Sequence, residues 1–210
     1  DLWASTIDLP MFESGSLTVS ECHNLTSLSA PVFEDTKDIY GIRISDNPSI
    51  ISVDLSQLKT VAASIGADIE VYNNPSLVDL DLASLEMTDG LFVYENDSLV
   101  TFAAPLLENS DWLTEFEIHN NHSLTTIELP MVDDTTNSWG DNAIINISFN
   151  DALTSIDLSS LSTHSGDLII EGNDMLVNLN LPQVDYVGRA EIIGNPSLTA
   201  VDLSGLSDGN

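Results

Sequence analysis

The chain has 210 residues, of which 34 are acidic and only 4 are Lys or Arg, so its formal net charge is −30. Such a surface repels nucleic-acid phosphates and anionic lipid headgroups, and we expect neither as a partner. It favours cations, basic partners or a saline exterior that screens the repulsion. Apolar residues make up 42% of the sequence, but no run of 18 of them predicts a transmembrane segment. The single cysteine, Cys22, leaves no internal disulfide.

Residues 1–14 resemble the second half of a repeat, because Ile7, Leu9 and Phe12 have the spacing found later in the chain. These residues do not have the pattern of a signal peptide. We therefore expect the chain to be a processed or excised piece of a longer protein, beginning with a partial coil.

From residue 17 onward, a unit of roughly 25 residues repeats about eight times. The segments IRISDNPSIISVDLSQL, IEVYNNPSLVDLDLASL and AEIIGNPSLTAVDLSGL show it clearly. With the first residue of a unit numbered 1, apolar residues fall at positions 1, 3, 9, 12, 14 and 17, and Asn at position 6. The units begin at Leu17, Ile42, Ile69, Leu91, Phe116, Ile145, Leu168 and Ala190.

The spacing within each unit predicts two short strands and no helix. Positions 1 and 3 alternate, as do positions 12 and 14, which is typical of strands with one face inward. Glycine precedes the first strand in seven units and suggests tight bends there. One coil cannot bury its own apolar face, whereas stacked coils bury a continuous column. We therefore predict a single all-β domain, a parallel β-solenoid in which each coil adds a strand to each of two sheets.

The Asn at position 6 is the most regular polar residue of the repeat. An inward Asn satisfies backbone groups at a bend, from coil to coil, which favours a structural role over ligand binding. Cys22 takes its place in the first unit and is expected to be a small buried residue. The ladder consists of Asn47, Asn74, Asn96, Asn121, Asn150, Asn173 and Asn195.

The stretches GDLIIEGNDMLVNLNLPQV, from Gly166 to Val184, and GRAEIIGNPSLTAVDLSGL, from Gly188 to Leu206, carry a resemblance. They resemble the receptor L-domain type of leucine-rich repeat. They also resemble the fungal GPI-anchored cell-wall organisation and sporulation proteins built from such repeats. The resemblance covers nearly the whole chain. It implies a right-handed solenoid, placement outside the cell or on its surface or wall, and no enzymatic activity.

Positions 11 and 13 should form an outward face of acids and hydroxyls on the second sheet. Asp54, Asp79, Asp81 and Asp157 lie in these columns. The first three should lie within a Debye length and raise one another's pKa. Carboxylates with nearby hydroxyls suit calcium, the one ion we consider as a cofactor, although a solvated face of a salt-adapted protein explains them too.

The outward positions of the first sheet vary from coil to coil. Tyr72, Phe92, Tyr94 and His119 should cluster over three adjacent coils. Aromatic side chains grouped on a rigid sheet predict a recognition surface for a protein or glycan ligand. The alternatives are that a loop covers them or that they are ordinary cross-rung pairs.

The longest step between units, from Phe116 to Ile145, contains the polar segment DDTTNSWGDN at residues 133–142. It predicts a protruding loop that offers Trp139 as a further ligand contact. Trp112 lies in a shorter insertion of the same kind.

Four N-x-S/T sequons lie along the chain. Asn96 and Asn121 belong to the inward ladder, where a glycan would be blocked. Asn24 and Asn146 are therefore the expected glycosylation sites.

Nothing in the sequence predicts catalysis, and we assign no catalytic residue. Polysaccharide-active β-solenoids need clustered basic residues, yet Lys37, Arg43, Lys59 and Arg189 are scattered along the chain. Asp133 and Asp134 form an acidic pair without basic companions.

A metal site is an alternative at His119 and His122, near Glu117, but no third ligand of suitable spacing is evident.

The function predicted from these features is adhesion or recognition outside the cell. One alternative is a structural subunit that stacks end to end into a fibre or wall layer, since SLTAVDLSGLSDGN offers no polar cap. Ice binding is less favoured, because the position-13 column is acidic where a threonine ladder would be expected.

Overall fold

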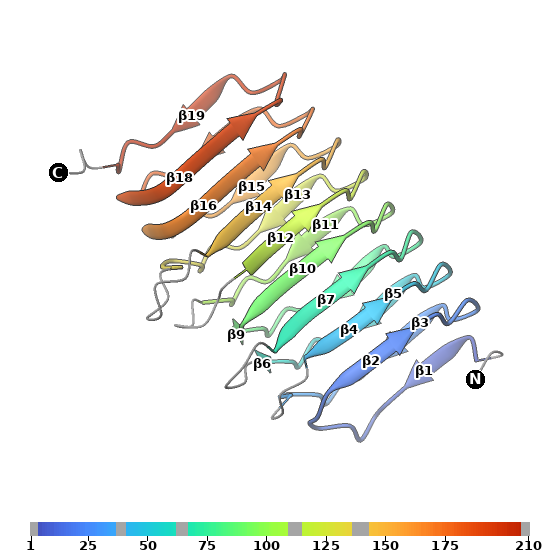
Figure 1. Ribbon diagram of the computed structural model, residues 1–210. Helices are drawn as coiled ribbons and strands as arrows, with labels where there is room; N and C mark the ends of the chain where they lie inside the picture. The colour runs from blue at the N-terminus through green and yellow to red at the C-terminus, as the bar shows by residue number, and fades with distance from the viewer. Residues whose placement is uncertain (1–3, 37–40, 62–66, 109–114, 136–142, 207–210) are drawn as a thin grey trace.

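The computed structural model describes residues 4–36, 41–61, 67–108, 115–135 and 143–206, and these form a parallel β-solenoid (Figure 1). They contain no helix, and hence none that is able to cross a membrane. The prediction of an all-β, parallel solenoid is confirmed.

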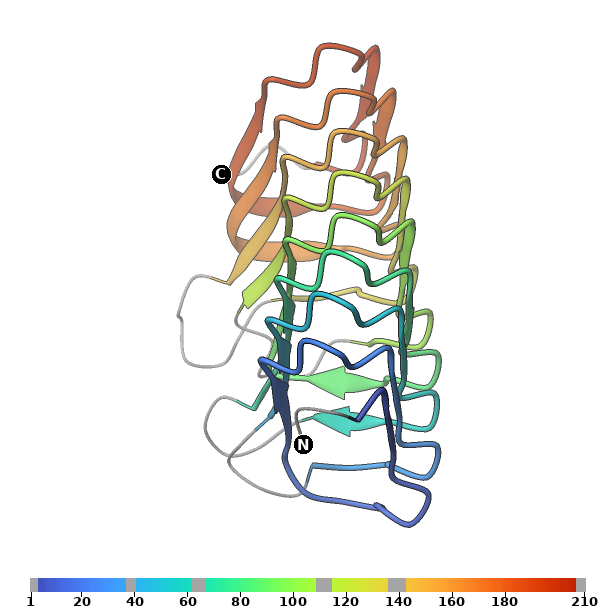
Figure 2. The same ribbon diagram turned by 90° about the vertical axis from the view of Figure 1, so that its right-hand side faces the viewer.

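The first side of the solenoid is one eight-stranded sheet, here called the long sheet, whose neighbouring strands are all parallel. Between its first and last strands the chain completes about seven turns (Figure 2). Its strands, in spatial and chain order, are β2 (Leu17–Ser20), β4 (Ile42–Ser45), β7 (Asp68–Tyr72), β10 (Gly90–Tyr94), β12 (Glu115–His119), β14 (Ile144–Ser148), β16 (Thr163–Glu171) and β18 (Tyr186–Ile193).

The second side consists of three-residue strands at positions 11 to 13 of the repeat. They pair in parallel as three successive sheets of four, three and two strands. These strands are β1 (Thr6–Asp8), β3 (Ser27–Ser29), β5 (Ser52–Asp54), β8 (Asp79–Asp81), β11 (Thr101–Ala103), β13 (Thr126–Glu128), β15 (Ser155–Asp157), β17 (Asn178–Asn180) and β19 (Ala200–Asp202).

A third side, which the repeat did not predict, closes each coil. It consists of β6 (Thr60–Val61), β9 (Met87–Thr88), the first residues of β16 and β18, and isolated parallel bridges. Its inward side chains are short or polar, and Thr36, Thr88, Thr135 and His164 are buried. On this side only two residues of a coil pair with the neighbouring coil, and few of them are apolar. The sequence therefore shows no alternation of apolar and polar residues there.

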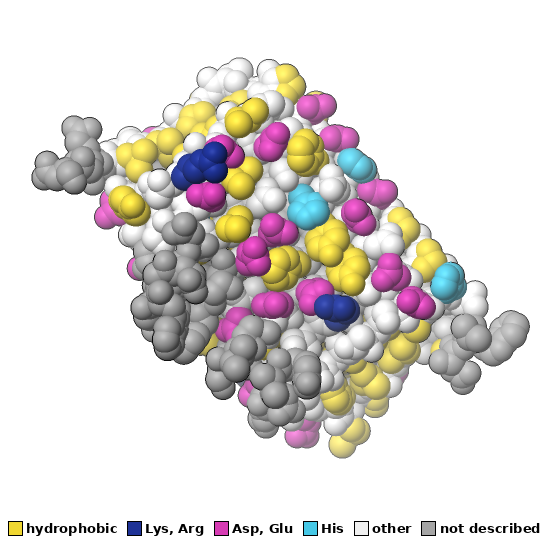
Figure 3. Space-filling model, viewed as in Figure 1, with side chains coloured by type: hydrophobic (Ala, Val, Ile, Leu, Met, Phe, Trp, Pro, Cys, Tyr) yellow, Lys and Arg dark blue, Asp and Glu magenta, His cyan; other side chains and the backbone are white. Residues whose placement is uncertain are grey.

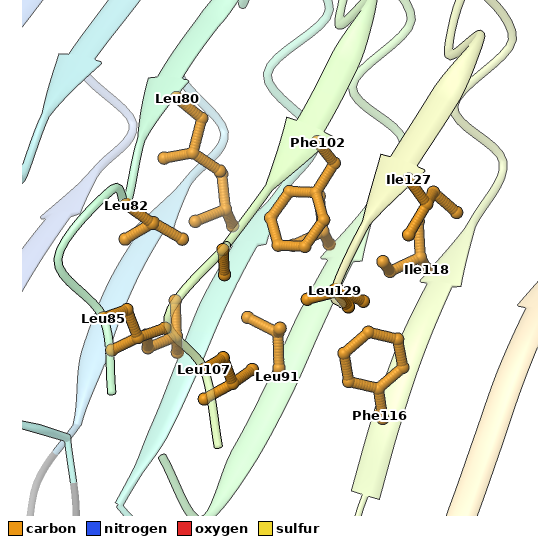
Figure 4. Packing of buried hydrophobic residues seen from close by; sticks show 14 of the residues in the cluster. Leu80, Leu82, Leu85, Leu91, Phe102, Leu107, Phe116, Ile118, Ile127 and Leu129 are labelled. Atoms are coloured by element: carbon orange, nitrogen blue, oxygen red, sulfur yellow. The ribbon is translucent and has the colours of Figure 1, made fainter. Parts of the chain in front are cut away.

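The core is a continuous column of apolar side chains from all three sides. Leu91 and Val93 of β10 are fully buried, as are Phe102 of β11 and Leu129 at the corner after β13. Figure 4 shows such side chains from successive coils pointing into one shared interior. Removing this surface from water is the main stabilising term, and it is available only when coils stack.

The Asn ladder connects each coil to the one before it. At Asn121, Nδ2 donates to the carbonyl of Val93 at 2.9 Å, and Oδ1 accepts the N–H of Asn96 at 3.0 Å. Cys22 is half-buried and begins the series, because its N–H donates to Oδ1 of Asn47 at 3.0 Å. The same bond to the next Asn in the series is made by the N–H groups of Asn47, Asn74, Asn96, Asn121, Asn150 and Asn173.

Replacing Asn121 by Ala should lower the free energy of unfolding by about 3 kcal/mol, because the Asn96 N–H loses its side-chain acceptor and two carbonyls lose a donor. Asn178→Ala, at an exposed position of β17, is the matched control and should change it by less than about 0.5 kcal/mol. Urea denaturation measures both, and equal losses would contradict a special role for the ladder.

The residue before each ladder Asn, and the residue before Cys22, adopts a left-handed backbone conformation. This turn ends the strand of the long sheet and directs the next side chain inward. Six of these residues are not glycine, so they adopt a conformation that costs an L-residue roughly 1–2 kcal/mol. The φ angles are 55° at Glu21, 59° at Asp46, 53° at Asn73, 57° at Glu95, 55° at Asn120, 53° at Phe149, 63° at Gly172 and 65° at Gly194.

Gly15 lies at a bend, as predicted, with a φ of 126°, whereas Gly41 and Gly166 serve a different purpose. A Cβ on Gly41 would lie 1.9 Å from the backbone oxygen of Asp68, and one on Gly166 would lie 1.7 Å from that of Ala143. Neither glycine has a positive φ. Glycine is needed there because the backbones of neighbouring coils approach closely.

Candidate functional site

The outward side chains of β7, β10 and β12 form a regular grid of three strands and three rows, here called the β7–β10–β12 face. The grid arises because the strands pair in parallel without a register shift. Figure 3 shows apolar and acidic side chains gathered in the middle of this side of the molecule. The rows are Asp68, Gly90 and Glu115, then Glu70, Phe92 and Glu117, then Tyr72, Tyr94 and His119.

The third row is a stack of aromatic rings. The centroids of Tyr72 and Tyr94 lie 4.9 Å apart, those of Tyr94 and His119 lie 4.7 Å apart, and each pair is inclined by 7°. The structure thus brings together these three side chains, with Phe92 in the row beside them. Both faces of the Tyr94 ring are covered by its neighbours.

A hollow of about 490 Å³ lies over all three rows of the grid and reaches Tyr94 and His119 in the third row. Gly90 contributes no side chain, and the space above it is shared by the carboxylate of Asp68 and the ring of Phe92. A Cβ at Gly90 would lie 2.4 Å from Asp68 Oδ1 and 2.8 Å from Phe92 Cε2. The acids Glu70, Glu115 and Glu117 line the same hollow, which is therefore acidic with an aromatic floor.

Negative charge on this face is only partly balanced. Burial, together with the nearby charges of Glu70, Asp89 and Glu115, raises the pKa of Asp68 to about 6. Burial also raises the pKa of Glu115, with a contribution from Glu117.

The nearby bases provide little compensation. Arg43 of β4 pairs with Glu70 at 2.7 Å. Among the described residues, no other Lys or Arg forms an ion pair with the four acids of the grid, which are Asp68, Glu70, Glu115 and Glu117. Burial lowers the pKa of His119, so its ring, 3.8 Å from Glu117, is neutral at pH 7. The face therefore carries carboxylates that repel one another.

Replacing Asp68 by Asn should stabilise the protein at pH 7. A carboxyl whose pKa is raised on folding destabilises the fold once it ionises, so the gain should appear as the pH rises from about 4 through 6. After allowance for solvent screening we expect on the order of 1 kcal/mol.

Asp79→Asn removes the same charge from an exposed site on β8 and serves as the control. Thermal melts from pH 4 to pH 7.5 compare the two. An equal effect of both substitutions at every pH would show that only the net charge matters.

The acids of the second side are largely engaged by the backbone. Oδ1 of Asp54 accepts the N–H of Ser56 at 3.1 Å, and Asp81 and Asp157 each accept the N–H two residues on, both at 3.0 Å. The expectation of raised pKa values is wrong for Asp54, because hydrogen bonds from Ser56, and also from Ser29, lower its pKa. Asp79 is exposed beside Ser52 and Asp54.

No group of three His, Cys, Asp or Glu side chains in the described ranges is arranged to hold a metal ion. The alternative site at His119, His122 and Glu117 does not assemble, because His119 is stacked on Tyr94 while His122 lies 3.0 Å from Asp151.

The expected glycosylation sites differ in accessibility. Asn24 is exposed in a turn, whereas Asn146 lies half-buried within β14 and its Oδ1 is enclosed. Asn96 and Asn121 are fully buried in the ladder. Asn24 is therefore the better acceptor.

Some of the predicted features fall outside the described residues. These are Trp139 with most of its loop, Trp112 and Lys37.

Sequence reasoning missed the first row of the grid. Asp68, Gly90 and Glu115 immediately precede position 1 of their units, so they were not counted among the outward positions. The period-2 alternation already applied to positions 2 and 4, extended back by two residues, identifies them.

Comparison with known proteins yields no match: no family model, no curated protein and no solved structure is significantly similar to this chain.

Proposed function

We propose that this chain is a non-catalytic recognition or adhesion domain that binds a partner through the β7–β10–β12 face. The observation that carries the proposal is the stack of Tyr72, Tyr94 and His119 beside an acidic hollow. Rigid aromatic side chains lose little entropy on binding, and such residues dominate many interfaces. The paired strands beneath them hold the positions of the side chains before a ligand arrives.

The proposal includes the finer identity of the repeat. The coils are right-handed, of the leucine-rich type found in receptor L domains, and lie at the cell exterior or in a wall. The sequence resemblance at Gly166–Leu206 supports this, as does the regular recurrence of the inward apolar positions from coil to coil. The proposal also includes calcium, as an ion that associates separately with the exposed carboxylates of the second side at Asp54, Asp79, Asp81 and Asp157, which do not converge on one ion.

A non-catalytic role fits the chemistry of the face. The grid holds carboxylates, phenols and one imidazole whose ring is stacked, and its nearest base, Arg43, already pairs with Glu70. No nucleophile lies beside a base oriented by a third group among the nine grid positions, which is the arrangement covalent catalysis needs.

Arrays of glycans and of purified extracellular proteins test the proposal. A partner of the native chain should bind the Tyr72→Ala, Tyr94→Ala double variant at least about ten-fold more weakly, because the aromatic contact is lost. Tyr186→Ala, which removes an exposed Tyr from β18, is the matched control and should bind normally. Thermal melts establish that each variant is folded, and partners that bind all three proteins equally would contradict a role for this face.

A second candidate is end-to-end stacking into a fibre or wall layer. In the last coil, Val201 and Leu206 are 44% and 42% exposed, whereas the equivalent Phe102 and Leu107 are 0% and 1% exposed. A further coil, whether a continuation of this chain or part of a second copy, would bury them and continue the sheets.

Sedimentation velocity tests stacking. Stacking predicts that the sedimentation coefficient of the native chain rises with protein concentration. It should stay constant in the double variant Val201→Lys, Leu206→Lys. A native protein that remains monomeric at about 100 μM would argue against stacking between copies.

A further inference from the structure

We propose that the β7–β10–β12 face binds an arginine side chain of a partner protein, held over Gly90 and Phe92 by the carboxylates of Asp68, Glu115 and Glu117. This inference rests on the proposed function of the face and names the chemistry of its ligand.

The grid leaves room for one planar cation. Asp68 and Glu115 stand on strands on either side of Gly90, so their backbones are two strand spacings apart, or about 9.6 Å. Gly90, between them, has no side chain, so the Asp68 carboxylate and the Phe92 ring lie over it, and the hollow that would take the cation lies above those two groups. A guanidinium has donors on several edges, so it is able to bond to carboxylates on both sides at once while its plane rests near the Phe92 ring.

The charges of the face call for a cation. It carries four carboxylates and one arginine partner, which leaves 4 − 1 = 3 negative charges uncompensated. Arg43 already shows the expected chemistry, since its Nη2 donates to Oε1 of Glu70 at 2.7 Å. The net charge of −30 adds a long-range attraction for basic partners.

A neutral glycan fits this face less well. Sugars pack their C–H groups against an open ring face, and both faces of Tyr94 are covered by Tyr72 and His119. A metal ion also fits less well, because calcium needs six or more oxygens converging at about 2.4 Å, whereas these carboxylates are spread around Gly90 and Phe92.

Amide NMR of the ¹⁵N-labelled full chain tests the inference with two short probes. The first is acetyl-Gly-Arg-Gly-amide, and the second has citrulline, the uncharged analogue of arginine, in place of Arg. The arginine probe should shift the amide signals of Gly90, Phe92 and Glu115 in a saturable way. The citrulline probe should leave them unchanged, because it lacks the charge.

Two triple variants of equal net charge locate the site. Asp68→Asn, Glu115→Gln, Glu117→Gln should weaken binding of the arginine probe roughly ten-fold, as expected from the loss of three partly exposed ion pairs. The control, Glu86→Gln, Glu128→Gln, Asp174→Asn, removes three exposed acids that lie away from this face and should weaken it less than about two-fold. The distribution of amide signals shows that both variants are folded.

Several outcomes would overturn the inference. Shifts spread over all acidic surfaces, or equal losses in both variants, would show nonspecific attraction to the net charge. Calcium chloride that reproduces the arginine shifts at lower concentration would identify a metal site. A glycan that needs Tyr72 and Tyr94 but tolerates the Asp68, Glu115 and Glu117 substitutions would refute the arginine ligand and leave the proposed function standing. Partner binding that ignores every substitution on the face would refute both.

Discussion

In-register parallel pairing between successive coils is the constraint on which the rest of this structure depends. The step between paired residues is 22 from Asp68 to Gly90 and 29 from Glu115 to Ile144, yet both pairs keep the same register. Each position of the repeat is therefore stacked on itself, and any polar group that points inward must be satisfied by its own copies. The Asn ladder meets that requirement, because each Asn both accepts from and donates to the preceding coil.

The same constraint produces the candidate site. Stacking like positions places two tyrosines and a histidine in one row, whereas the acids stand in pairs along β7 and along β12, on either side of Gly90 and Phe92. The aromatic rings stack favourably, whereas the acids repel one another, and burial followed by this repulsion raises the pKa of Asp68. The paired strands hold the acids of this face in place although their charges repel one another. The face is therefore suited to a cationic partner, because binding would remove the repulsion.

Backbone demands account for many of the polar residues that looked available for ligands. Asp54, Asp81 and Asp157 hold the turn that follows the second strand, and the left-handed residue before each ladder Asn explains why Asp, Asn or Gly is frequent there. Their regular spacing is a sign of this structural use. Irregular outward columns, such as the one that contains Phe92, are where a specific contact is more reasonably sought.

The sequence by itself determined the solenoid, the inward apolar columns and the Asn ladder, because burial imposes the same residue type on every coil and so leaves a repeat to be read. Tertiary structure alone decided the third side, where two paired residues per coil leave no alternation, and the neighbours of each outward side chain. Outward columns carry no such repeat, and their contacts join residues 22 to 29 positions apart. For this reason Tyr72, Tyr94 and His119 were foreseen as a cluster, whereas the covered faces of Tyr94 and the carboxylates around Gly90 became visible only in the folded chain.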